Sequence, residues 1–374
     1  MSYYERGKTK KTDNLPIELD PVTGNKYYGY CQSSGLMIGK FTVVLIVVTS
    51  AMLAGSAWPV SSASQSQPAM YQEARRLMWT KFEIIAYGAD RARLAEVAEA
   101  AFEEIDRLDR QMSNYSETSE LTYINRNAAL EDVIVEKELF DFLKLSIDYS
   151  RTTAGTFDIT VGPLMKAWGF FDSKGRVPDA VELKSVIARV GFKHVLLNER
   201  THTIRFDREG VELDLGGIAK GYAVDRAAEI LRASGVTSAF ITSGTSSICA
   251  IGAPPGQNAW RVEVSDPLDR SHQLEAIEIK DRSISTSGCH EKTFESAGKS
   301  YCHIMDPRAG RPIEGLLSAT VITQSGVEAE VLSKALMIMG IEKARDFLKT
   351  RPHVRAILYY HQPEGGLGCA RLNF

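Results

Sequence analysis

ELDLGGIAKGYA, residues 212–223, decides more about the fold of this chain than any other stretch. Val211, Leu213 and Leu215 alternate as on a buried strand, which two glycines then interrupt. The residues that follow, 218–231, have the periodicity of an amphipathic helix. Paired glycines let a ligand approach the backbone, and the free N–H groups that open a helix attract anions. Because the spacing matches neither the dinucleotide-binding motif nor the P-loop, a phosphate site and an ordinary strand–turn–helix corner both stay open.

The composition is that of a globular protein. The chain has 374 residues, of which 44% are hydrophobic and 24% are charged, and its formal net charge is −3. This length is enough for one large domain or two small ones. The near-neutral charge and the lack of a basic block argue against nucleic acid as a partner.

Predicted strands and helices alternate along the chain. Runs of antiparallel strands interrupted by pairs of helices indicate an α+β class. Strands are predicted at 82–87, 195–197, 203–206, 238–242, 261–264, 274–279, 319–322 and 355–360, and helices at 91–112, 138–152, 180–190, 218–231, 329–339 and 342–348.

An apolar segment near the N-terminus predicts a membrane anchor. Residues 41–60 carry no charge over twenty positions, which is about the length that spans a bilayer core. Six Lys and Arg residues precede this segment and none follows it before Arg75, so we expect a cytoplasmic N-terminus and an exported domain. A leader this long favours an uncleaved anchor, with cleavage near 61–63 as the alternative. The expected divisions are 1–40 cytoplasmic, 41–60 transmembrane helix or signal anchor, 61–70 linker and 71–374 domain.

The five cysteines leave the redox chemistry open. Cys31 would lie on the cytoplasmic side, and the other four would be exported. Four cysteines in an oxidising compartment allow three complete disulfide pairings, and unpaired buried thiols are an equal alternative. The pairs Cys289-His290 and Cys302-His303 suggest zinc, but neighbouring side chains on a strand point to opposite faces, so no closed zinc site is expected.

Further motifs follow one another in an order that resembles a known family. With DLGGIAKG at 214–221 they resemble, in order and spacing, the ApbE family of FAD:protein FMN transferases, over about residues 76–358. The resemblance implies a T-fold-like ApbE domain with antiparallel sheets and packed helices. It also implies transfer of the FMN moiety of FAD to a Thr or Ser hydroxyl of a target flavoprotein, with release of AMP. The motifs are MSNY at 112–115, SEL at 119–121, GTFDIT at 155–160, WGF at 168–170, TSG at 286–288, HIMDPRAG at 303–310 and SATVI at 318–322.

The resemblance assigns FAD-binding positions. Trp79 departs from the family, which has glycine there, and its bulk would narrow the pocket. From the residues alone, the alternative for Tyr115 is a core tyrosine, and the alternative for Asp158 and Asp214 is that they cap turns. The loop 243–247, SGTSS, is expected to line the active site. The positions that match FAD contacts of the family are Met78, Tyr115, Thr156, Phe157, Asp158, Asp214, Lys220 and Met305.

His303 is the predicted catalytic residue. The resemblance places a catalytic histidine at this position, and an imidazole with a reference pKa of about 6.5 can accept the proton of an attacking hydroxyl. Asp306, Pro307 and Gly310 predict a tight turn that fixes its orientation. A structural histidine on a strand is the alternative.

The expected Mg²⁺ site departs from the family pattern. The family helix reads approximately Ala-Asp-x-Leu-x-Thr-Ala, and its Asp and Thr bind Mg²⁺ with a carbonyl of the glycine-rich loop. Here Glu330 replaces the Asp, Lys334 stands in the slot of the Thr, and Gly217 supplies the carbonyl. Either Lys334 turns to solvent and Ser333 joins a weakened metal site, or its ammonium replaces the metal.

The sequence therefore predicts a flavin transferase of the bacterial inner membrane, with its N-terminus inside and its catalytic domain periplasmic. The expected partners are FAD, a target flavoprotein with an acceptor Thr or Ser, and the membrane through 41–60. Two alternatives use the same site. One is a catalytically weak relative that binds FAD, and the other is an FAD pyrophosphatase that releases FMN and AMP.

Overall fold

The computed structural model describes residues 67–374. The predicted segments 1–40 and 41–60 lie outside this range, as does most of the predicted linker 61–70. Within 67–374, no helix combines the length and the apolar character needed to cross a bilayer.

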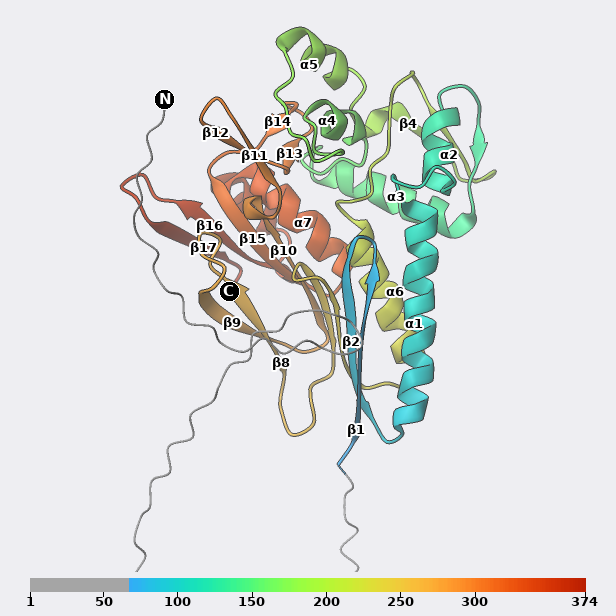
Figure 1. The fold of residues 1–374 in the computed structure, drawn as a ribbon, viewed down its shortest axis with the longest axis vertical. Helices are drawn as coiled ribbons and strands as arrows, with labels where there is room; N and C mark the ends of the chain where they lie inside the picture. The colour runs from blue at the N-terminus through green and yellow to red at the C-terminus, as the bar shows by residue number, and fades with distance from the viewer. Residues whose placement is uncertain (1–66) are drawn as a thin grey trace, which may run out of the picture. The chain divides into compact units, whose positions relative to one another are not determined.

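The fold is built on an eight-stranded sheet whose strands lie side by side in the order in which they occur in the chain (Figure 1). Every neighbouring pair is antiparallel. Along the second strand, Phe82, Ile84 and Ala86 are buried and the side chains between them are less so, as expected for a strand with one face in the core. The strands are β1 (Ala69–Leu77), β2 (Thr80–Gly88), β6 (Ser238–Ser243), β7 (Ser247–Ile251), β10 (Arg282–Gly288), β15 (Leu316–Thr323), β16 (Arg355–His361) and β17 (Leu367–Leu372).

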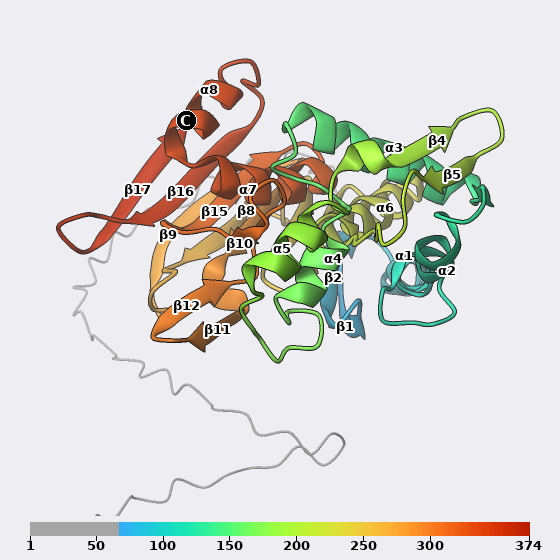
Figure 2. The same cartoon turned by 90° about the horizontal axis from the view of Figure 1, so that it is seen from above.

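Three long helices cover one face of this sheet. The first, α1, buries Leu94, Val97 and Ala101 at helical spacing, as its sequence predicted. The helix α7 packs on β10 and β15 and is buried on most of its surface, between the sheet, α6 and α8. The long helices on this side are α1 (Arg91–Met112), α6 (Ala219–Ala233) and α7 (Gly326–Met339) (Figure 1). The short helix α8 (Ile341–Leu348) lies beside α7 (Figure 2), and α2 (Glu120–Asn127) and α3 (Lys137–Thr152) lie beyond the long helices.

The opposite face of the central strands packs on a hairpin of β8 (Trp260–Ser265) and β9 (Gln273–Ile279). Ile248 of β7 and Ile284 of β10 share an apolar cluster with Trp260. Strands buried on both faces show no alternation of apolar and polar residues. For this reason the sequence predicted neither β7, whose residues are all buried, nor β10.

Short elements gather at one end of the sheet. The hairpins formed by residues 293–312 lie beside α4 and α5 (Figures 1 and 2) and share with them a cluster that includes Trp168 and Phe294. These elements are α4 (Gly162–Ala167), α5 (Ala180–Ile187), β11 (Thr293–Ser296), β12 (Lys299–Cys302), β13 (Met305–Asp306) and β14 (Arg311–Pro312). A separate three-stranded sheet contains β3 (Val133–Ile134), β5 (Thr203–Phe206) and β4 (Val195–Asn198).

The predicted α+β class with antiparallel sheets and packed helices is confirmed. The helix predicted at 329–339 begins earlier, at Gly326, because Ser325 caps it. The helix predicted at 180–190 ends at Ile187.

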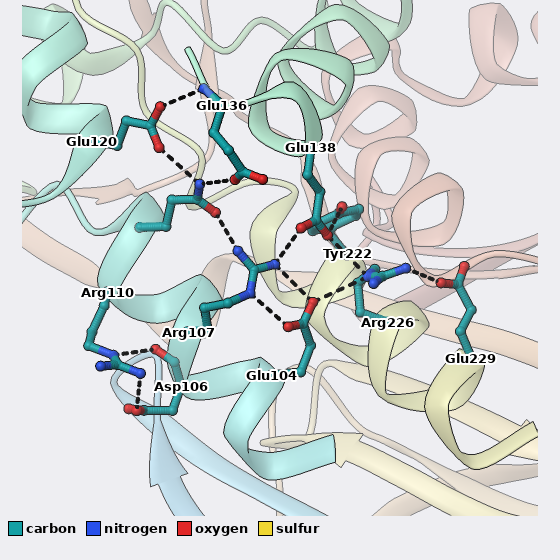
Figure 3. Close-up of polar contacts among 11 residues, drawn as sticks. Glu104, Asp106, Arg107, Arg110, Glu120, Glu136, Glu138, Tyr222, Arg226 and Glu229 are labelled. Atoms are coloured by element: carbon teal, nitrogen blue, oxygen red, sulfur yellow. Dashed lines mark hydrogen bonds and ion pairs between the residues drawn. The ribbon is translucent and has the colours of Figure 1, made fainter. Parts of the chain in front are cut away.

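A network of ion pairs ties α1, α3 and α6 together (Figure 3). Arg107 of α1 bonds Glu104 on its own helix and Glu138 of α3, the latter at 2.6 Å. From α6, Arg226 reaches Glu104 at 3.3 Å, and the Tyr222 hydroxyl donates to Glu138 at 3.0 Å. The Arg107 guanidinium holds the pKa of Glu104 below its usual value. Because several charges are shared, the network fixes α6, the helix that follows the glycine turn.

Candidate active site

The helices α6 and α7 cross at two glycines. A Cβ atom on Gly221 would overlap the carbonyl oxygen of Gly326, and one on Gly326 would lie 2.8 Å from the carbonyl oxygen of Gly221. Only residues without a side chain allow the two backbones to approach this closely. The crossing places the first turn of α6 directly against α7.

Asp225 of α6 fixes the start of α7 against this crossing. Its carboxylate accepts hydrogen bonds from the backbone N–H groups of Gly326, at 2.6 Å, and Val327, at 2.9 Å, and from the Ser325 hydroxyl at 2.8 Å. These are free N–H groups of a helix N-terminus, which a carboxylate satisfies in charge and in hydrogen bonding. Burial raises the pKa of Asp225, and the three bonds oppose that rise.

One buried carboxylate, that of Glu330, lies at the crossing. Its side chain is 1% exposed, and Oε2 accepts a hydrogen bond from the backbone N–H of Gly221. The other oxygen, Oε1, lies 3.4 Å from Nζ of Lys334 and 4.0 Å from Nζ of Lys220. Lys220 also donates to the Ser246 hydroxyl at 3.1 Å, so the loop 243–247 lies beside these residues as predicted. Two ammonium groups therefore face a single carboxylate.

Lys334 points into the site. Its Nζ donates to the backbone carbonyl of Glu330 at 3.2 Å, and its side chain is 21% exposed. The stem lies over the glycine turn, since a Cβ on Gly217 would be 3.4 Å from Cδ of Lys334 and 3.3 Å from the Phe157 ring. Burial lowers the pKa of Lys334, and the Glu330 carboxylate opposes this shift. Of the two sequence alternatives, the ammonium lies beside Glu330 and is not turned to solvent.

These residues do not fit Mg²⁺. Ser333 bonds the Ser287 hydroxyl at 2.7 Å and the Glu330 carbonyl at 2.9 Å, so it is turned away from the Glu330 carboxylate. In residues 67–374 no three His, Cys, Asp or Glu side chains converge as ligands for a metal ion. Mg²⁺ requires near-octahedral oxygen ligands, whereas here one engaged carboxylate faces two ammonium groups.

His303 follows β12 and is held through the carbonyl of Lys292. That oxygen accepts from the backbone N–H of His303 at 3.0 Å and lies 3.3 Å from Nδ1 of the imidazole. Because a carbonyl only accepts, Nδ1 carries the proton in this bond and Nε2 has a free lone pair. Burial, followed by the nearby Lys334 ammonium, lowers the pKa of His303 to about 4. The imidazole is therefore neutral at physiological pH and able to accept a proton at Nε2.

The turn and the cysteines around His303 restrict its backbone. The predicted tight turn is present, because the N–H of Gly310, with a φ of 67°, donates to the carbonyl of Asp306 at 2.8 Å. Met305 is buried and pairs with Pro312 across β13 and β14. On the other side, Cys302 forms a disulfide with Cys289, with their Cα atoms 5.0 Å apart. The two other cysteines in the described chain, Cys249 and Cys369, are free thiols.

An exposed aromatic group lies on another side of the glycine turn. Tyr115 is 52% exposed and stacks on Phe171, with ring centroids 4.7 Å apart, so the alternative of a core tyrosine is wrong. The Asp214 carboxylate contributes to raising the pKa of Tyr115, after burial. Met78 and Trp79 form the tight turn between β1 and β2, both with positive φ, and the Trp79 ring lies 5.5 Å from that of Tyr115. The ring of Tyr115 offers a stacking surface close to Asp214.

Asp158 and Asp214 each cap their own turn. Asp158 accepts from the N–H and hydroxyl of Thr160 and from the N–H of Phe192, and Asp214 accepts from the N–H of Gly216 at 2.8 Å. Burial raises the pKa of both carboxyl groups. Their geometry is thus the turn-capping one that the sequence left open.

Two neighbours of Asp158 support the same loop. The hydroxyl of Thr156 is buried and donates to the carbonyl of Thr153 at 2.9 Å. The ring of Phe157 belongs to the apolar core and supports the glycine turn.

The structure thus brings Gly217, Lys220, Glu330 and Lys334 together from two distant segments, and His303, from a third, lies within electrostatic reach of both lysines. Asp214 and Tyr115 lie at the edge of this group, whereas Thr156, Asp158 and Met305 act in its support. The sequence analysis missed Lys292 and Phe171. Phe171 directly follows the WGF motif, so that motif was one residue too short, whereas nothing in the sequence around Lys292 indicates its contact with His303.

Comparison with known proteins places this arrangement in a family. The profile of the ApbE family matches residues 78–358. The chain is 29% identical to an FAD:protein FMN transferase of Escherichia coli K12 over 311 residues, which cover 80% of this chain and 88% of that protein. It is 35% identical to the enzyme of the same name from Vibrio cholerae over 248 residues, 64% of this chain and 73% of that protein.

Solved structures agree. The ApbE protein from Thermotoga maritima superposes with a TM-score of 0.74 at 29% identity, covering 81% of this chain and 97% of that one. The flavin transferase ApbE from Vibrio cholerae gives a TM-score of 0.71 at 28% identity, covering 82% and 97%. Because the family profile spans residues 78–358, about three quarters of the sequence, this chain belongs to the ApbE family.

Proposed function

We propose that this protein is an FAD:protein FMN transferase. A Thr or Ser hydroxyl of a target flavoprotein attacks the FMN-side phosphorus of FAD, a new P–O bond to the acceptor forms, and the pyrophosphate P–O bond breaks to release AMP. The proton of the hydroxyl passes to Nε2 of His303. The observation that carries this proposal is a neutral imidazole, fixed through Nδ1, beside two ammonium groups at a glycine turn.

Each group of the site has a role in this reaction. The ammonium groups of Lys220 and Lys334 offset the negative charge of the pyrophosphate. As the P–O bond breaks, negative charge grows on the leaving oxygen of AMP, and the same ammonium groups stabilise it. The exposed ring of Tyr115 stacks on a flat ring of FAD. Asp158 and Asp214 keep the loops around the substrate in position through their backbone hydrogen bonds.

The test is a reaction of the purified full-length protein with FAD and a peptide that contains an acceptor threonine. We expect AMP and a flavin–peptide adduct in equal amounts by chromatography and mass spectrometry, and no adduct on a peptide with valine in place of the threonine. Free FMN and AMP without adduct would instead identify a pyrophosphatase. Bound FAD with no AMP would identify a catalytically inactive flavin-binding protein.

We further propose that residues 41–60 anchor the protein in the bacterial inner membrane and that the catalytic domain, 71–374, is periplasmic. The charge asymmetry around 41–60 supports this orientation. The Cys289–Cys302 disulfide also supports it, because disulfides persist in oxidising compartments.

This topology makes a direct prediction. Alkaline phosphatase, which is active only outside the cytoplasm, is expected to be active when fused after Phe374, whereas a cytoplasm-dependent fluorescent protein at the same position is expected to be dark. Removal of residues 41–60 is expected to reverse both signals. An inactive phosphatase together with a fluorescent full-length fusion would overturn the proposed orientation.

A further inference from the structure

Lys334 is held in a defined position in the middle of α7. Its Nζ is 3.2 Å from the Glu330 carbonyl and 3.4 Å from Glu330 Oε1, and its stem contacts the glycine turn at Gly217. These contacts come from two separate segments, so they restrict both the stem and the ammonium group. A lysine fixed in this way acts as a charge of known position and not as a solvated surface cation.

Glu330 has no free oxygen with which to bind a metal. Oε2 accepts the N–H of Gly221, and Oε1 faces Lys334 at 3.4 Å and Lys220 at 4.0 Å. A divalent cation at this carboxylate would have to displace an ammonium group or lie within a few ångströms of both, where like charges repel strongly in a partly buried site.

Among Glu330 and the two lysines that face it, one positive charge is in excess, since Asp225, the other carboxylate near the crossing, is bonded to the start of α7. The carboxylate of Glu330 balances one of the two ammonium groups, so the other is free to pair with an anion. The glycine turn and the first turn of α6 adjoin these groups, and the positive end of the helix dipole adds to the attraction for an anion. The pyrophosphate of FAD carries two negative charges, and this surplus offsets one of them without any metal.

We propose that the ammonium group of Lys334 is the fixed counter-cation of this site, so that the protein binds the FAD pyrophosphate and transfers FMN without a divalent metal. This inference rests on the proposed function. Lys220, at the start of α6, has a different role because its Nζ also donates a hydrogen bond to the Ser246 hydroxyl. Lys334 instead occupies the position beside Gly217.

The experiment measures the affinity for FAD by quenching of flavin fluorescence, in EDTA and in excess Mg²⁺. For the full-length protein we expect the same dissociation constant in both, and no heat of binding when Mg²⁺ alone is titrated into it. Lys334→Thr is expected to weaken FAD binding about 10- to 100-fold in EDTA, the loss typical of a charge-assisted hydrogen bond. Lys334→Arg is expected to retain most of the affinity.

Two further variants make the result specific. Lys343→Thr removes an exposed lysine from α8 and is the matched control, with unchanged affinity expected. Glu330→Asp combined with Lys334→Thr removes the ammonium and gives two oxygen ligands, so its FAD affinity is expected to recover when Mg²⁺ is added. Circular dichroism confirms that each variant is folded. The Mg²⁺ titration uses the parent protein alone, so it tests the inference even if a variant does not fold.

The inference is overturned if the parent binds FAD only with Mg²⁺, or if Lys334→Thr binds FAD as the Lys343→Thr control does. Failure of the metal-free inference can be distinguished by experiment from failure of the proposed function. AMP release that depends strictly on Mg²⁺ contradicts the metal-free inference and leaves the transferase function intact. FAD binding in EDTA that Lys334→Thr weakens, with no AMP release either in EDTA or in Mg²⁺, contradicts the transferase function and the metal-free transfer but supports the role of Lys334 in binding.

Discussion

Replacement of His303 by alanine is expected to reduce the rate of FMN transfer about 10²- to 10⁴-fold, the usual contribution of a positioned general base. FAD binding is expected to stay within a few-fold of the parent, because Nε2 of His303 faces the acceptor hydroxyl in the proposed reaction and its Nδ1 bonds the protein backbone. Transfer is measured as AMP release with an acceptor peptide, and binding as quenching of flavin fluorescence.

The matched control is His272→Ala, which removes an exposed histidine paired with Asp269 in the turn between β8 and β9. It is expected to leave both quantities unchanged. If His303→Ala transfers FMN at the parent rate, His303 is structural and the proton acceptor lies elsewhere.

The same histidine determines a pH dependence. Because the pKa of His303 is lowered to about 4 in the free protein, the imidazole is unprotonated well below the usual value of about 6.5. The imidazole of His303 can act as a base only while it is unprotonated. We therefore expect kcat/KM to stay constant as the pH falls from 8 to about 5 and to decline only below that. Bound FAD brings negative charge and raises the pKa, so the decline in kcat should occur at a higher pH. A decline of kcat/KM centred near pH 6.5 would contradict the lowered pKa of His303.

Replacement of Gly221 by alanine is the second change with a large expected effect. The added methyl group would overlap the carbonyl oxygen of Gly326, and it would also lie 3.0 Å from Oε2 of Glu330. Neither the backbone of Gly326 nor the buried side chain of Glu330 can easily move aside, so α6 and α7 must move apart. The free energy of unfolding is expected to fall by about 1–3 kcal/mol, and FAD affinity to fall as the hydrogen bond from Gly221 to Glu330 is lost.

Urea denaturation measures the stability and flavin fluorescence measures the affinity. The control is Ala233→Ser, which adds one atom at the exposed end of the same helix and should change neither. Parent-like stability and affinity in Gly221→Ala would show that the two helices are not in close contact.

The sequence predicts the parts of this site that depend on local pattern. The α6 helix follows from the apolar spacing after the two glycines, and α1 follows from its own apolar spacing. The strand expected before the glycines is wrong, because residues 211–215 form a partly buried but irregular segment, in which Leu213 bonds the Asn125 side chain in place of a strand partner. The resemblance to ApbE proteins aligned Lys334 with a metal ligand, but an alignment cannot say where a long flexible side chain points. The contacts with Glu330 and Gly217 decide that question.

Other features depend on contacts between distant segments. The pairing of Cys289 with Cys302 requires their Cα atoms to be 5.0 Å apart, which no cysteine count reveals. Asp158 also accepts a hydrogen bond from the N–H of Phe192, thirty-four residues away. A local pattern cannot show such a contact, so the sequence could not decide whether Asp158 binds FAD or caps a turn. Stacking of Tyr115 on Phe171 is equally invisible in a local pattern.

The order of the eight-stranded sheet has a consequence for how the protein is made. Since each strand joins the edge left by the strand before it in the chain, the sheet can grow in the direction of synthesis, and no strand has to insert between two that are already paired. Glu330 and Lys334 belong to α7, which follows all but the last two strands. A chain that is still being made can therefore build most of its scaffold and its glycine turn, but it has no assembled charge cluster until α7 arrives. Chemistry on FAD is thus reserved for a nearly complete molecule.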